Sequence, residues 1–117
     1  MYPLVYHKHL TPEKWSAYTR GQQVLMIANE LNRAKNLLNR GDRSSARLCY
    51  ERAFERIDLT SEDEKWRGKL KEFRRFRELL AELYLAQDQD VHRLEQLYIA
   101  LLRLSAEAHR MLYPAVR

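Results

Sequence analysis

Residues 24–57 read VLMIANELNRAKNLLNRGDRSSARLCYERAFERI and contain two runs of helical periodicity, one on each side of Gly41-Asp42. Apolar residues recur at steps of three and four in both runs: Val24, Ile27, Leu31, Ala34 and Leu38, then Ala46, Tyr50, Ala53 and Ile57. Such spacing lays one apolar stripe along each helix. Gly41 suits the left-handed conformation that closes a helix, and Asp42 suits the cap of the next one. The sequence therefore predicts a helical hairpin with its apolar stripes packed together.

Before the hairpin, the chain carries a separate helix start. Thr11 provides a capping hydroxyl and Pro12 is favoured at the first helical position. The spacing of Trp15 and Tyr18 predicts that both side chains face the core. Gly21 interrupts this segment, so we expect either a helix break there or one bent helix that continues into the first arm of the hairpin.

After the hairpin, two further helices are predicted. Ser61 and Glu64 have the spacing of a capping box, which predicts the start of a third helix that runs to about Gln87. Asp90 is the predicted cap of the last helix, which continues to near Pro114. Short connections force neighbouring helices to run antiparallel. The predicted fold is thus all-α: an up-and-down antiparallel bundle of four long helices with an extra N-terminal helix or extension.

The size and composition fit one helical domain spanning residues 1–117, with residues 1–10 as an N-terminal arm. Cys49 is the single cysteine and lies beside the apolar stripe, so we interpret it as a small buried hydrophobe rather than a reactive thiol. The sequence shows neither a signal-peptide core nor an apolar run long enough to span a membrane. We expect a cytoplasmic protein that does not bind membranes.

Basic residues are concentrated in one window of the chain, although the net charge is only +5. Residues 65–77 contain seven basic residues and one acid. On a helical wheel four of them gather opposite the aromatic stripe: Arg67, Lys71, Arg74 and Arg75. Such a face suits an anionic partner, but the aromatic residues point the other way, and a stacking platform for single-stranded nucleic acid needs both on one surface. We therefore favour a solvated face over a nucleic-acid site.

The sequence offers little for catalysis, and the protein is more simply read as a non-enzyme. It contains no glycine-rich phosphate loop, no nucleophile elbow and no Cys/His metal cluster. His7 and His9 stand two residues apart without a nearby acid or thiol, which is a weak metal signal. We expect neither a metal nor a cofactor.

Residues 34–58 resemble two families of helical proteins. The small, turn and aromatic positions of a tetratricopeptide repeat are matched by Ala34, Gly41, Ala46, Tyr50 and Ala53. The same run is similar to the first hairpin of HEPN domains, whose pattern is met by Ala34, Leu37-Leu38, Gly41-Asp42, Ala46, Tyr50 and Ala53-Phe54. Many HEPN domains carry an arginine followed four to six residues later by a histidine, used in RNA cleavage or nucleotide binding. The resemblance implies that role for Arg103 and His109, which have this spacing.

Two hypotheses for function follow. In the first, the chain is a non-catalytic module that binds a partner protein or a second copy of itself. It is motivated by apolar residues that lie off the main stripes, which one molecule need not bury: Leu25, Met26, Leu37, Leu48 and Ile99. In the second, it is a HEPN-like module for RNA processing or nucleotide binding, which would use Arg103, His109 and the basic face.

Overall fold

The computed structural model describes residues 10–112 of the chain, and their side chains as far as residue 110. The elements in chain order are α1 (Pro12–Ser16), α2 (Arg20–Asn39), α3 (Arg43–Ser61), the 3-10 helix η1 (Glu64–Lys69), α4 (Leu70–Leu85), α5 (Val91–Leu102) and α6 (Ala106–Leu112). No strand occurs in this part of the chain. The all-α class is therefore confirmed, while the predicted arm lies almost wholly outside the described residues.

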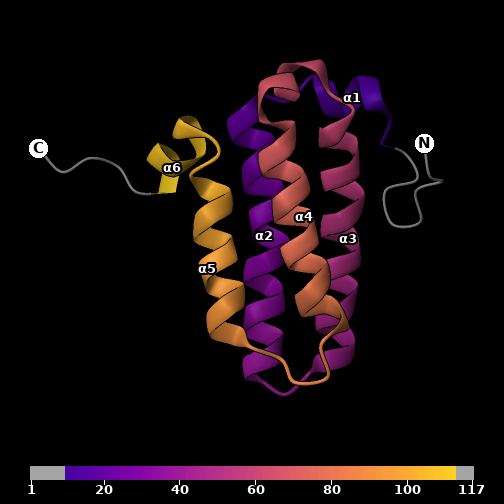
Figure 1. Cartoon of the computed structure of the whole chain (residues 1–117), viewed down its shortest axis with the longest axis vertical. Helices are drawn as coiled ribbons and strands as arrows, with labels where there is room; N and C mark the ends of the chain where they lie inside the picture. Colours follow the sequence, from indigo (N-terminus) through magenta and orange to yellow (C-terminus); the bar gives the residue numbers. More distant parts are fainter. Residues whose placement is uncertain (1–9, 113–117) are drawn as a thin grey trace, which may run out of the picture.

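The predicted hairpin is the α2–α3 pair, which lies side by side along its length (Figure 1). Gly41 takes a φ of 79°, and its N–H donates to the Leu38 carbonyl at 3.0 Å. The Asp42 N–H donates to the Leu37 carbonyl at 2.9 Å, and the Asp42 side chain accepts from the Ser45 N–H at 3.1 Å. Together these bonds close α2 and open α3 within one tight turn, as the glycine and the aspartate predict.

The later helices pack on the hairpin. Helix α4 packs on α3, whereas α5 and α6 pack mainly on α2. The aromatic stripe of η1 and α4 points inward, because Trp66 and Phe73 are fully buried and meet edge to face with ring centroids 4.7 Å apart. Helices α4 and α5 are consecutive in the chain but pack mainly on different arms of the hairpin, and α2 is seen between and behind them (Figure 1).

The predicted interruption at Gly21 is wrong in position. Helix α1 ends at Ser16, and α2 begins at Arg20 with Thr19 as its cap. Thr19 and Gln22 form a reciprocal capping box, with bonds of 2.9 and 3.1 Å, which starts the new helix before the glycine is reached. The break also corrects the expectation for Tyr18: Trp15 is buried, but Tyr18 lies in the linker and is 37% exposed.

The helix start predicted at Ser61 is also wrong. Helix α3 continues through Ser61, whose hydroxyl donates to the Ile57 carbonyl at 3.0 Å instead of capping a new helix. Asp63 caps η1 by accepting from the Lys65 N–H, and α4 begins only at Leu70. An aspartate two residues further on thus takes the capping position, and the segment that contains Gly68 winds as a 3-10 helix.

The last helix is not continuous. Helix α5 ends at Leu102, and Ser105 opens α6 by accepting from the Ala108 N–H at 3.2 Å. A serine inside a helical pattern can compete for backbone N–H groups in this way. The break turns α6 back onto α2, where Glu107 accepts from the Gly21 N–H and the Thr19 hydroxyl, both at 3.1 Å.

This contact predicts an unusual effect of replacing Gly21 with alanine. In a helix that change normally stabilises by about 1 kcal/mol. A Cβ at Gly21 would lie only 2.5 Å from the Glu107 Cδ, so the Glu107 side chain must leave its two hydrogen bonds. We expect Gly21→Ala to lower the free energy of unfolding by about 1 kcal/mol, measured by urea denaturation. In a Glu107→Ala background the same substitution should stabilise, and destabilisation in both backgrounds would contradict this interpretation.

The buried side-chain amide of Gln23 connects α1, α2 and η1. The Gln23 side chain is fully buried, and its Nε2 donates to the Trp15 carbonyl at 2.8 Å and to Asp63 Oδ2 at 3.0 Å. Its Oε1 accepts from the Trp66 indole N–H at 2.7 Å. One side chain on α2 therefore satisfies polar groups of α1, of η1 and of the Asp63 cap.

Asp63 also makes stability depend on pH. Burial alone would raise the pKa of Asp63, but hydrogen bonds from Lys65 and Gln23 outweigh it and hold the pKa below the usual 3.8. Its contribution is therefore present above pH 3.8 and is lost as the pH falls through the lower folded-state pKa. We expect Asp63→Asn to cost about 1 kcal/mol at neutral pH and to flatten the loss of stability below pH 4. If urea titrations show that Asp63→Asn and the unaltered protein lose the same stability below pH 4, this explanation is wrong.

Candidate functional site

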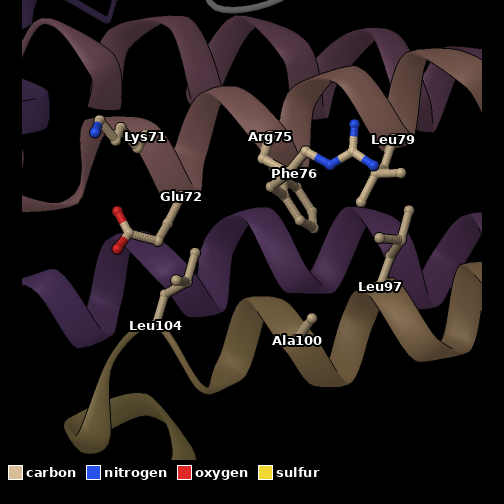
Figure 2. A pocket seen from close by; sticks show the side chains of 8 residues that line it. All are labelled: Lys71, Glu72, Arg75, Phe76, Leu79, Leu97, Ala100 and Leu104. Carbon is tan, nitrogen blue, oxygen red and sulfur yellow. The ribbon is translucent and has the colours of Figure 1, made fainter.

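An apolar groove of about 380 Å³ lies between α4 and α5. In the close view α4 forms one wall and α5 the other, with α2 running behind the gap (Figure 2). The residues that line it are Lys71, Glu72, Arg75, Phe76, Leu79, Leu97, Ala100 and Leu104. The groove follows from the fold, because α4 rests on α3 and α5 rests on α2.

The inner surface of the groove is hydrocarbon. Phe76 and Leu97 lie deepest, with 5% and 7% of their surface exposed, and both belong to the core. Leu79 and Leu104 are half-buried along the two walls. Ala100 is exposed, and its small side chain leaves open space on the α5 side of the groove, opposite Phe76 (Figure 2). Among the described residues, the groove therefore presents apolar surface mainly from Leu79, Ala100 and Leu104.

Its rim is basic on the α4 side. Lys71 and Arg75 are exposed there, and Glu72 is the one acid among the lining residues. Arg75 lies 3.4 Å from Glu78 with both side chains largely in solvent, an arrangement worth little. The other two residues of the predicted basic face, Arg67 in η1 and Arg74 in α4, are exposed but do not line the groove. Two of the four residues of the predicted basic face therefore lie at the rim of the apolar groove.

The residues suggested by the HEPN resemblance lie elsewhere. Arg103 is exposed and is the C-cap residue that follows α5, whereas His109 is half-buried on α6 beyond the Ser105 break. They therefore belong to two helices rather than one, and neither lines the groove. Their role in RNA or nucleotide chemistry stays a prediction.

The other expectations about reactive groups concern Cys49 and metals. Cys49 is buried, as predicted, and burial raises the pKa of its thiol, with a further contribution from Glu30. A raised pKa suppresses the reactive thiolate. Among the residues that the structure describes, no group of three or more His, Cys, Asp or Glu side chains could hold a metal ion. His7 and His9 lie outside the described residues.

The off-stripe apolar residues form no single exposed patch. Leu25, Met26 and Leu37 are half-buried against the core, and Ile99 is half-buried on α5. Leu48 is 43% exposed on α3. An apolar surface that the sequence interpretation did not single out lies in the groove. A readable signal existed, because Leu97, Ala100 and Leu104 recur at steps of three and four as a second apolar row on the last helix.

Comparisons with models of protein families, with curated proteins and with solved structures gave no match to this chain. Within the described residues, none of the helices combines the length and the apolar character that a membrane crossing requires.

Proposed function

We propose that the protein is a non-catalytic interaction module whose α4–α5 groove receives an acidic amphipathic helix of a partner protein. The observation that supports this is the coincidence of an uncovered apolar groove with a basic rim. Binding a helix in an apolar groove is a common mode of peptide recognition, in which apolar anchors enter the groove and flanking charges set the orientation.

A helix suits the shape of the groove. The lining residues of α4 run from Lys71 to Leu79, eight residues apart, which corresponds to about 12 Å of helix axis. That length accommodates two turns of a bound helix and therefore anchors at positions i, i+4 and i+7. Phe76 and Leu79 from α4 face Leu97 and Ala100 from α5 (Figure 2), so anchors can contact both walls at once.

The charge of the rim selects an acidic partner. Lys71 and Arg75 stand above the apolar walls, inside a window with seven basic residues and one acid. A partner helix with glutamates beside its apolar stripe would pair with them, whereas a basic helix would be repelled. Exposed ion pairs contribute about 0.2–1 kcal/mol each, so two pairs give roughly twofold to thirtyfold discrimination.

The up-and-down arrangement predicted from the sequence is part of this proposal. The packing of α4 on α3 and of α5 on α2 supports an antiparallel bundle whose fourth side, between α4 and α5, stands partly open. The partner helix would close that side by adding apolar contacts across the gap.

The proposal is tested by binding of a synthetic helical peptide with leucines at i, i+4 and i+7 and flanking glutamates. We expect saturable binding in fluorescence anisotropy, with a Kd on the order of 10 µM. Ala100→Trp should weaken it at least about tenfold, because the indole fills the groove. Ala100 is exposed, so the variant should fold.

His92→Trp is the matched control, since it places a tryptophan at an exposed position of α5 that does not line the groove. It should bind the peptide as the unaltered protein does. Peptide binding that survives Ala100→Trp would contradict the proposal. So would a dimer of the protein alone that Ala100→Trp disperses in sedimentation, because a second copy would then occupy the groove.

A further inference from the structure

Apart from the basic rim of the groove, a cluster of charged residues lies at the interface between α2 and α3. Glu30 on α2 has only 2% of its side chain exposed, yet three guanidinium groups converge on it. Arg33 Nη1 lies 3.1 Å and Arg56 Nη1 3.7 Å from Glu30 Oε1, while Arg52 Nε lies 3.2 Å from Glu30 Oε2. The carboxylate thus holds three arginines from two helices in one place.

This cluster carries more positive charge than its structural role requires. The four side chains, one carboxylate and three guanidinium groups, together carry a charge of +2. The pKa of Arg56 is lowered by its burial and by repulsion from Arg33 and Arg52, which together outweigh the attraction of Glu30. In addition, the Nε of Arg56 is a buried polar atom without a hydrogen-bond partner. Guanidinium groups are the side chains best suited to bind the oxygens of a phosphate in pairs, and three of them meet here.

The cluster is also open to solvent. The exposed fractions of the side chains are 63% for Arg33, 29% for Arg52 and 22% for Arg56. Helix α4 does not cover it, because α4 contacts the face of α3 that carries Glu51 and Asp58. Helical spacing places Arg52 and Arg56 on the other side of α3. A small ion can therefore reach the exposed parts of these guanidinium groups from solvent, whereas Arg56 Nε itself is buried.

We propose that Arg33, Arg52 and Arg56 form a binding site for a phosphate group, with Glu30 as the buried carboxylate that positions the three arginines. A phosphate dianion matches the two surplus charges, and its oxygens accept the paired N–H donors that guanidinium groups present. The phosphate is that of free inorganic phosphate or of a small phosphomonoester. This site is separate from the groove and goes beyond the proposed docking function.

The test is an NMR titration of the arginine Nε–H signals at constant ionic strength. Inorganic phosphate should shift the signals of Arg52 and Arg56 along a saturating curve, with acetate as the comparison anion. Methyl phosphate is titrated in parallel: tighter binding than inorganic phosphate assigns a phosphomonoester, and weaker binding assigns the free ion. Either result supports the site.

Arg33→Ala should weaken phosphate binding at least about fivefold by removing one of three charged ligands. Arg67→Ala is the matched control, because Arg67 also pairs with a glutamate three residues earlier in the chain but lies in η1. It should leave binding unchanged. Both arginines are largely exposed, so both variants should fold. Shifts that do not saturate, equal shifts with acetate, or binding unaffected by Arg33→Ala would overturn the proposal.

Discussion

Replacing Gln23 with leucine is expected to lower the free energy of unfolding by about 3 kcal/mol. The substitution keeps an apolar body of similar length but removes every polar atom of the amide. The Trp66 indole N–H then loses its acceptor in surroundings from which water is excluded. The Trp15 carbonyl and Asp63 Oδ2 each lose one donor and keep another, from the Tyr18 N–H and from Lys65 Nζ. A buried donor left without its partner costs about 1–3 kcal/mol, and the two further hydrogen bonds lost at the Trp15 carbonyl and Asp63 bring the total to the expected size.

Urea denaturation followed by circular dichroism measures this effect without relying on the fluorescence of Trp15 or Trp66. Asn36→Leu is the control, because it makes a similar change on the exposed face of the same helix. We expect that variant to change stability by less than about 0.5 kcal/mol. A Gln23→Leu protein as stable as the Asn36→Leu protein would show that the amide does not join α1, α2 and η1 as described.

The second large effect is expected from Glu30→Ala, which should lower the free energy of unfolding by about 2 kcal/mol. Removing one partner of a sealed ion pair costs about 3–5 kcal/mol. The arginines here are partly exposed, so they can turn toward water, and the expected loss is smaller. Because Arg52 and Arg56 lie on α3, the change also weakens the α2–α3 seam.

Glu95→Ala provides the control for Glu30→Ala. Glu95 also pairs with a basic residue of another helix, Lys35, but at 3.9 Å and with half of its side chain exposed. That pair should contribute less than about 0.5 kcal/mol. Adding Arg56→Met to Glu30→Ala should restore part of the lost stability by removing an uncompensated buried charge. No recovery in the double variant, measured in the same urea titrations, would contradict this explanation.

The elements that the sequence predicted well are those fixed by neighbouring residues. The Gly41-Asp42 turn needs only the residues on either side of it, and the same holds for the Thr11 and Asp90 caps. Each helix start that was misplaced lies near a second residue that can also cap a helix. Ser61 matched a capping box, but Asp63 capped the segment, a choice that also brings Asp63 to Gln23.

The buried polar residues and the groove depend on contacts between distant parts of the chain. Gln23 reaches Trp66 across 43 residues, and Glu30 reaches Arg52 across 22, so nothing beside either residue in the sequence predicts its burial. The basic face was readable from charge spacing alone. Its position beside an apolar groove was not, because that depends on how far α4 and α5 stand apart.

The most direct measurement of the docking proposal is a charge-reversal experiment on the rim. The unaltered protein should bind the acidic peptide about tenfold more tightly than a peptide in which lysines replace the glutamates. The Lys71→Glu/Arg75→Glu variant should reverse that preference. The Arg67→Glu/Arg74→Glu variant carries the same change in net charge away from the groove and should keep it. If both double variants behave alike, the rim does not select the partner, and the proposed acidic helix does not occupy the groove.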